Sequence, residues 1–183
     1  MSDNQSAGVS ASAAPANPGA VPEAYFTVGP LKFSLMALAT FGLFELYWFF
    51  RNWQIIRNQG RRQISPIARA FFAPIWTFSM GKCFKDQAQA ENVSLSLPVA
   101  LLGIAYLVVQ ALWVLPDPYW LVSFFAFAVV LPFDFAARRL NGKGELAPPT
   151  HGRFSGWNIA WLIVGSLLLV LAVIGAFIPE PSL

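Results

Sequence analysis

The sequence predicts an all-α integral membrane protein with four transmembrane helices and one further amphipathic helix that is interfacial or re-entrant. The chain has 183 residues, of which 56% are hydrophobic and 11% are charged, whereas a soluble domain carries about 25% charged residues. Four apolar stretches are long enough to cross a bilayer, and the basic residues gather in two of the connections between them. Together these observations favour a multi-pass membrane fold.

Residues 1–30 precede the first apolar stretch and consist mainly of Ala, Ser, Pro, Gly and Asn. They contain too little apolar bulk to offset the entropy of ordering, so we expect a disordered tail. The tail lacks the basic region and apolar core of a secretory signal peptide, so the first apolar stretch is expected to stay in the mature protein. Residues 31–183 are predicted to form a single helical membrane domain.

The four predicted spans are 33–50, 98–115, 119–136 and 157–178. Eighteen residues of helix at about 1.5 Å per residue give roughly 27 Å, close to the ~30 Å thickness of the hydrocarbon layer. The sequence Pro116-Asp117-Pro118 separates the second span from the third and cannot continue a helix. These two spans should therefore form an antiparallel hairpin.

The additional helix is predicted at about 65–90 and begins with the apolar stretch PIARAFFAPIWTFSMG (66–81). Arg69 and Pro74 argue against a full crossing, whereas Ser65 suits a helix N-cap and Pro66 suits the first helical position. An interfacial or re-entrant helix is expected. The alternative is a fifth crossing, which would leave one basic loop on the wrong side.

The distribution of Lys and Arg predicts the orientation. Of the 12 basic residues, seven lie in 51–97 and four in 137–156, and Lys32 is the remaining one. Basic loops stay in the cytoplasm, so both loops are expected inside and both termini outside. Aromatic residues are expected to mark the two interfaces, with Trp48, Trp53 and Trp157 inside and Trp113, Tyr119 and Trp120 outside.

Glu45 lies within the apolar run TFGLFELYWFFRNW (40–53). An unpaired carboxylate costs about 2.5 to 3.5 kcal/mol at the centre of a membrane helix, so Glu45 should be protonated or face a partner. Asp134 and Arg138 are spaced to pair with each other, leaving Arg69 or Arg139 for Glu45. The predicted polar cluster comprises Glu45, Asn52, Arg69, Asp134, Arg138 and Arg139. The alternative is that Glu45 only supports helix packing or reaches the nearby interface.

The composition disfavours several classes of protein. Cys83 is the only cysteine and His151 the only histidine, so no metal site or other cofactor is expected within one chain. No catalytic motif is found, and no enzyme activity is predicted. A net charge of +3 does not indicate a nucleic-acid partner. Arg57, Arg61 and Arg62 are expected to contact anionic lipid near the inner surface.

Residues TFGLFELYWFFRNW, followed by ISPIARAFFAPI (64–75), resemble a group of uncharacterised bacterial inner-membrane proteins. In that group a first span with TFGLY-like and YWFYRNW-like motifs precedes an I-x-P, RAFF-like segment. The resemblance covers 40–81 and implies a location in the bacterial inner membrane, but no established activity. This chain has Phe44 and Phe50 where the group commonly has Tyr.

The expected function is that of an accessory or scaffold component that packs with another membrane protein or with a second copy of itself. The alternative is a proton-coupled small-molecule transporter that uses Glu45, by analogy with small multidrug exporters that carry a Glu in the first of four helices. A scaffold predicts a buried, paired Glu45, whereas a transporter predicts a Glu45 that water reaches and that titrates near neutral pH.

Overall fold

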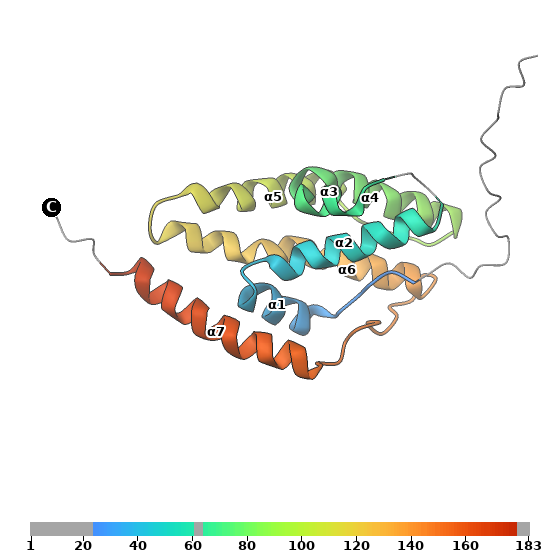
Figure 1. Cartoon of the computed structure of the whole chain (residues 1–183). Helices are drawn as coiled ribbons and strands as arrows, with labels where there is room; N and C mark the ends of the chain where they lie inside the picture. Colours follow the sequence, from blue (N-terminus) through green and yellow to red (C-terminus); the bar gives the residue numbers. More distant parts are fainter. Residues whose placement is uncertain (1–23, 61–63, 179–183) are drawn as a thin grey trace, which may run out of the picture.

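The computed structural model describes residues 24–60 and 64–178, and this part of the chain is helical without any strand. The helices pack into an elongated bundle, with the termini of the described chain toward opposite ends (Figure 1). Their bounds are α1 Pro30–Ala39, α2 Leu43–Asn58, α3 Pro66–Phe71, α4 Ala73–Ala90, α5 Val99–Ala111, η1 Leu112–Val114, η2 Tyr119–Ala126, α6 Phe127–Asn141 and α7 Gly156–Ala176.

Within residues 24–60 and 64–178, two helices are long and apolar enough to cross a membrane. They are the continuous helix Tyr119–Asn141, formed by η2 and α6, and helix α7. Pro30–Ala39 and Val99–Val114 are apolar but shorter. The helical class is confirmed and membrane insertion is supported weakly, whereas four crossings are not established.

The predicted first span, 33–50, is not one helix, because the chain turns between α1 and α2. The amide of Gly42 donates to the carbonyl of Ala37 (2.9 Å) and that of Phe41 donates to Leu38 (3.2 Å). These two bonds form a Schellman motif, which ends a helix. Phe41 and Gly42 have φ of 53° and 83°, and glycine adopts such values readily. Thr40 completes the turn by accepting a hydrogen bond from the amide of Phe44 (2.9 Å).

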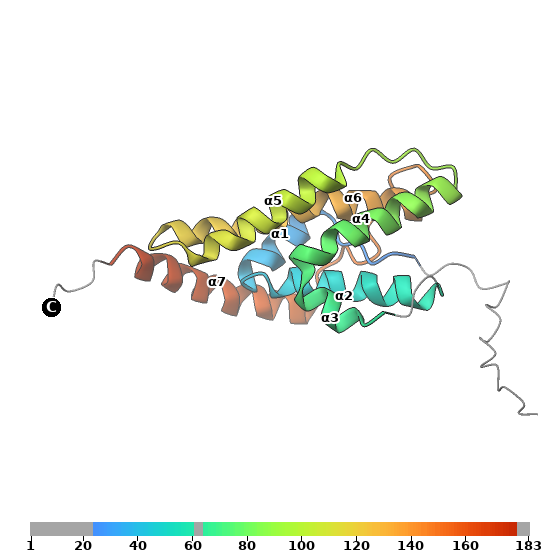
Figure 2. The ribbon, with the colours of Figure 1, turned by 90° about the horizontal axis from the view of Figure 1, so that it is seen from above.

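After this turn the chain runs back alongside α1 (Figures 1 and 2). The ten residues of α1 span about 15 Å, half the thickness of a hydrocarbon layer. The first apolar stretch therefore forms a helical hairpin, with both ends of the hairpin toward the same end of the bundle.

The predicted helix at 65–90 consists of two helices with a break at Phe72. Pro74 explains the break, because it has no N–H to donate to the carbonyl of Ala70 and its ring clashes with that carbonyl in a continuous helix, whereas proline is tolerated in the first turn of a new helix. Ser65 caps α3 by accepting a hydrogen bond from the amide of Ala68 (3.4 Å), and Pro66 is the first helical residue. Both of those predictions are confirmed.

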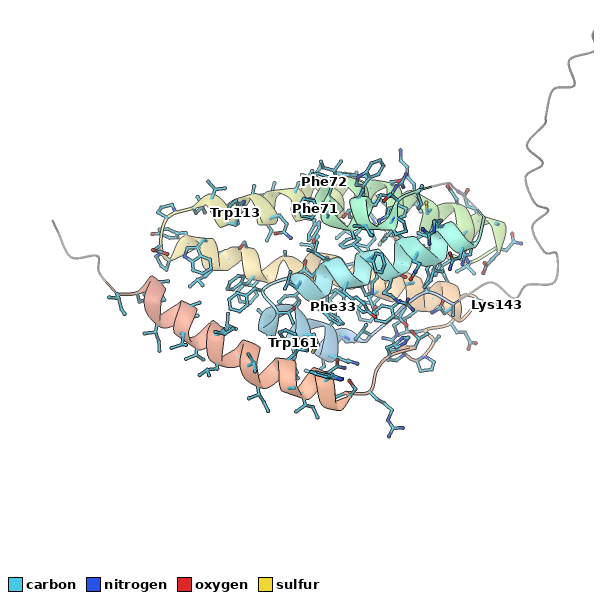
Figure 3. All side chains as sticks on the ribbon, viewed as in Figure 1. Phe33, Phe71, Phe72, Trp113, Lys143 and Trp161 are labelled. Atoms are coloured by element: carbon cyan, nitrogen blue, oxygen red, sulfur yellow. The ribbon has the colours of Figure 1, made fainter. Side chains whose placement is uncertain are left out.

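The predicted hairpin of the second and third spans is also confirmed, because η1 and η2 lie side by side around the turn at 115–118. Trp113 is labelled near this turn and Lys143 at the opposite end of the bundle (Figure 3). The third helix extends beyond its predicted end at 136 to Asn141.

The core contains several aromatic residues that were expected at a lipid interface. Trp48 and Trp53 are both 0% exposed, so they pack inside the bundle and do not face lipid, and their predicted place at the inner boundary stays a prediction. Trp113, Tyr119 and Trp157 are exposed, as a lipid-facing aromatic residue would be. Helix α7 meets α1 at Gly165, where an added Cβ would lie 1.7 Å from the carbonyl oxygen of Ala39. Only glycine permits this close approach.

Candidate functional site

Buried side chains hold segment 24–29, which precedes α1 and is neither helix nor strand. The Asn52 amide binds both backbone groups of Phe26, accepting from its N–H (3.1 Å) and donating to its carbonyl (3.1 Å). Asn141 binds Tyr25 in the same way, at 2.8 and 3.0 Å. Two amides from α2 and α6 thus satisfy backbone groups that would otherwise be buried without partners.

Asp134 on α6 continues this polar cluster. Its carboxylate accepts hydrogen bonds from the amides of Val28 (3.1 Å) and Gly29 (3.4 Å) and from the Trp48 indole (3.1 Å). It is 2% exposed and lies at the N-terminus of α1, where the helix dipole favours a negative charge. Asn52 joins the same cluster by donating to the carbonyl of Trp48 (3.0 Å).

The loop 142–155 binds the other side of segment 24–29. Thr27 and Thr150 exchange hydrogen bonds between their amides and hydroxyls, each at 3.0 Å, and the amide of His151 donates to the carbonyl of Thr27 (2.9 Å). Segment 24–29 and this basic loop therefore lie side by side. The sequence analysis placed them on opposite sides of a membrane, and this relative placement disagrees with the structure.

Glu45 lies two turns before Asn52 on α2 and has a separate environment. It is 2% exposed and accepts a hydrogen bond from the Tyr106 hydroxyl (2.9 Å), which in turn accepts one from Gln110 (3.2 Å). Glu45 also lines a cavity of about 310 Å³ together with Gln110, Ser123 and an apolar wall that includes Trp113 and Phe124. It is thus both paired and adjacent to open space.

The structure brings together only Asn52 and Asp134 from the predicted cluster. Arg138 donates to the carbonyl of Ala147 (2.8 Å) instead of pairing with Asp134, and Arg139 donates to the carbonyl of Gly144 (3.3 Å). Both arginines satisfy carbonyls of the loop that follows α6. The predicted pair with Asp134 is therefore not a contact-distance ion pair, although the Arg138 charge still acts on that carboxylate.

Arg69 does not fill the predicted place beside Glu45 either. Its guanidinium carbon lies 4.5 Å from the Trp53 ring centroid and 4.1 Å from that of Trp76, in cation–π geometry. The expected Glu45 contact is made by Tyr106 instead. Arg57 is exposed, as an anionic-lipid contact requires, whereas Arg61 and Arg62 lie outside the described residues.

A second and larger cleft, of about 630 Å³, opens between the α1–α2 hairpin and residues 149–158. Lys32 is buried beside it and donates to the carbonyls of His151 (2.9 Å) and Arg153 (2.6 Å). Partial burial, followed by the charges of Lys32 and Arg51, holds the pKa of His151 below its ordinary value. The His151 ring packs on Phe26, with centroids 4.6 Å apart.

Sequence reasoning missed Tyr106, Asn141, Thr150 and Lys32. Tyr106 is the one tyrosine in its apolar stretch, and a hydroxyl there is a reasonable partner for an intramembrane carboxylate. Asn141, Thr150 and Lys32 act on backbone groups far away in the sequence, and no periodicity reveals such contacts. The Thr40-Phe41-Gly42 motif could have indicated the turn, because glycine commonly follows a helix.

Comparisons with protein-family models, curated proteins and solved structures find no match for this chain. Among residues 24–60 and 64–178, no group of three or more His, Cys, Asp or Glu residues is arranged to hold a metal ion. In the part of the chain that the structure describes, the fold and site are all-helical, with two candidate membrane-crossing helices, a buried polar cluster, a cavity beside Glu45 and a cleft beside Lys32.

Proposed function

We propose that this chain is a multi-pass protein of the bacterial inner membrane that acts as an accessory or scaffold component by packing against a helix of another membrane protein. The observation that carries the proposal is the exposure of α7. Of its 21 residues only Gly165 is buried, and the remainder is apolar or small apart from Asn158 and Ser166. Such a helix needs lipid or a partner around it.

Ser166 favours a partner helix over lipid alone. Its side chain is exposed near the middle of α7, and its hydroxyl has no hydrogen-bond partner among the described residues. In a bilayer, Ser hydroxyls commonly form hydrogen bonds between helices, and small residues let two helices approach closely. Ser166 therefore suits a contact with a second transmembrane helix.

The proposed topology has three crossings, formed by α5 with η1, by η2 with α6, and by α7. The α1–α2 hairpin enters from the cytoplasmic side and returns to it, which keeps segment 24–29 beside the basic loop 142–155. The turn at 115–118 contains no Lys or Arg and would lie outside. Exposed Ile67 and Phe71 on α3, Phe72 at the break and Ile75 on α4 suit an interfacial position; Phe71 and Phe72 lie together on the outer side of the bundle (Figure 3).

Photo-crosslinking along α7 tests this proposal. A photoreactive amino acid replaces Leu167 or Leu171, which are 62% and 56% exposed, and control positions are Leu101 and Val108 on α5, which are 67% and 54% exposed. We expect protein adducts of one discrete mass from the α7 positions and none from the controls. Adducts of twice the chain mass identify a second copy as the partner. Equal yields from both helices would contradict the proposal.

A proton-coupled transporter is the second candidate, because Glu45 lines the cavity of about 310 Å³. Its burial and its bond to Tyr106 fit a structural role better. Transport requires that protons reach the carboxylate and that substrate competes with them. Uptake of a cationic dye into vesicles, compared between wild type and Glu45→Gln, separates the two. A pH-driven flux that only wild type supports would favour transport over the scaffold.

A further inference from the structure

The cleft beside Lys32 combines an aromatic wall with a basic one. Phe26, Phe44 and Tyr47 form the first wall. The other wall comes from Lys32 on α1, from the loop 149–155 with His151 and Arg153, and from Asn158 at the start of α7. No carboxylate lines the cleft, so its charge is positive. Its volume of about 630 Å³ lies within the usual range of ligand sites, ~300 to 1,000 Å³.

Lys32 gives this cleft a built cationic centre. Its side chain is 7% exposed, and two of the three N–H donors of its ammonium group bind the carbonyls of His151 and Arg153. The structure shows no ion pair between Lys32 and a carboxylate of the described residues. The ammonium also lies 5.6 Å from the Phe154 ring centroid, but no negative group of the described residues balances its charge, so an anion in the cleft would be favoured.

The N-terminus of α7 adds further donors at the same place. Ser155 caps the helix by accepting from the amide of Asn158 (3.4 Å). The amides of Gly156 and Trp157 have no hydrogen-bond partner within the described chain, as expected for the first turn of a helix. These amides and the helix dipole favour an anion beside Ser155 and Asn158, both of which line the cleft.

The surroundings of the cleft indicate a lipid rather than a soluble anion. Trp157 and Trp161 are 79% and 55% exposed and begin the apolar surface of α7 next to the cleft. Exposed tryptophans are typical of the level at which lipid headgroups meet hydrocarbon. The aromatic wall offers apolar surface to the glycerol and the first carbons of an acyl chain.

We propose that this cleft binds the phosphate headgroup of an anionic phospholipid. Lys32 and the Arg153 guanidinium would hold the phosphate oxygens beside the N-terminus of α7 at Ser155 and Asn158, while Phe44 and Tyr47 contact the apolar part of the lipid. The proposal uses the membrane location proposed above but not the partner on α7. It also concerns a site separate from Arg57.

Lipid binding to the full chain in a neutral detergent tests the proposal. Native mass spectrometry measures binding of phosphatidylglycerol, with phosphatidylcholine and inorganic phosphate as the comparison probes. We expect phosphatidylglycerol to bind about tenfold more tightly than phosphatidylcholine, because the choline cation of phosphatidylcholine offsets its phosphate charge and is repelled by Lys32 and Arg153. Equal affinity for the two lipids would overturn the proposal. Displacement by inorganic phosphate at equal concentration would overturn the assignment to a lipid.

Two variants locate the site. Arg153→Ala removes an exposed cation, and Asn158→Asp places a negative charge in the cleft; neither side chain is buried. Each should weaken phosphatidylglycerol binding about tenfold, whereas Lys85→Ala, an exposed control on α4, should not change it. Unchanged binding in both cleft variants would overturn the proposal. Membrane fractionation of the wild type tests the membrane location separately. A chain that fractionates with membranes but does not prefer phosphatidylglycerol would contradict the lipid site alone.

Discussion

Asn52 and Glu45 lie on the same helix, both buried, yet their surroundings differ. Asn52 makes three hydrogen bonds, two of them to the backbone of Phe26, and is 0% exposed. Glu45 has one hydrogen-bond partner among the described residues and borders a cavity. A buried polar group whose hydrogen bonds are all made holds its neighbours in place. A buried group with unpaired hydrogen-bonding atoms can instead change its protonation state or its partner. We therefore expect Asn52 to stabilise the fold, and we expect any chemical role on α2 to belong to Glu45.

Replacing Asn52 should have the largest effect. In Asn52→Leu the three hydrogen bonds are lost and both backbone groups of Phe26 are left buried without partners, which should cost about 3 kcal/mol or more. Arg57→Leu on the exposed face of α2 is the control. The free energy of unfolding in detergent measures both. A loss below about 1 kcal/mol for Asn52→Leu would contradict the structural role.

Asp134→Asn should have the next largest effect. An amide keeps the size of the side chain but presents an NH₂ group to one of the three donors, so we expect a loss of about 2 kcal/mol. Asp86→Asn on the exposed surface of α4 should leave stability unchanged. Equal stability of the two variants would show that the Asp134 carboxylate does not hold segment 24–29.

Glu45→Gln should have a smaller effect, below about 1 kcal/mol, because the Gln carbonyl can still accept from Tyr106. Tyr106→Phe should cost more, about 1 to 2 kcal/mol, because it removes the hydrogen bonds to Glu45 and from Gln110 and leaves the Glu45 carboxyl group buried without its partner. Thermal unfolding from pH 5 to pH 9 measures both. If the melting temperature of wild type changes with pH in this range and that of Glu45→Gln does not, the result would favour the transporter.

The smallest expected effect belongs to His151, which is exposed. Its pKa is lowered in the folded chain by partial burial and by the charges of Lys32 and Arg51. The unfolded chain then binds more protons as the pH falls below about 6.5, so stability is complete above that pH and declines as the pH falls toward the lower folded pKa. In wild type the melting temperature should fall as the pH decreases from 7.5 to 5, and in His151→Gln this fall should be smaller. An equal fall in the two proteins would contradict the assignment.

Hydropathy predicted the positions of these helices well, because each of them is apolar over a contiguous stretch of sequence. It placed α5, the η2–α6 helix and α7 within a few residues of their bounds, and the Pro116-Asp117-Pro118 turn between the first two. It missed the turn at 40–42, because Phe41 and Gly42 do not interrupt the apolar composition. That turn depends on backbone geometry, which a hydropathy average does not contain.

The polar cluster was predicted only in part for a different reason. Asn52 and Asp134 were identified because polar groups in apolar helices need partners. Their partners were not predicted, since they are backbone groups of segment 24–29 rather than charged side chains. Charge complementarity suggested Arg69 and Arg139 for Glu45, but the structure uses a hydroxyl from Tyr106.

Cysteine accessibility in oriented membrane vesicles tests most directly whether the first apolar stretch turns back instead of crossing. In a Cys83→Ala background, Ala24→Cys, Glu145→Cys and Asp117→Cys are exposed positions on segment 24–29, the loop 142–155 and the turn at 115–118. An impermeant thiol reagent should label positions 24 and 145 from the same side and position 117 from the other. Labelling of positions 24 and 145 from opposite sides would contradict the hairpin and restore a crossing first helix.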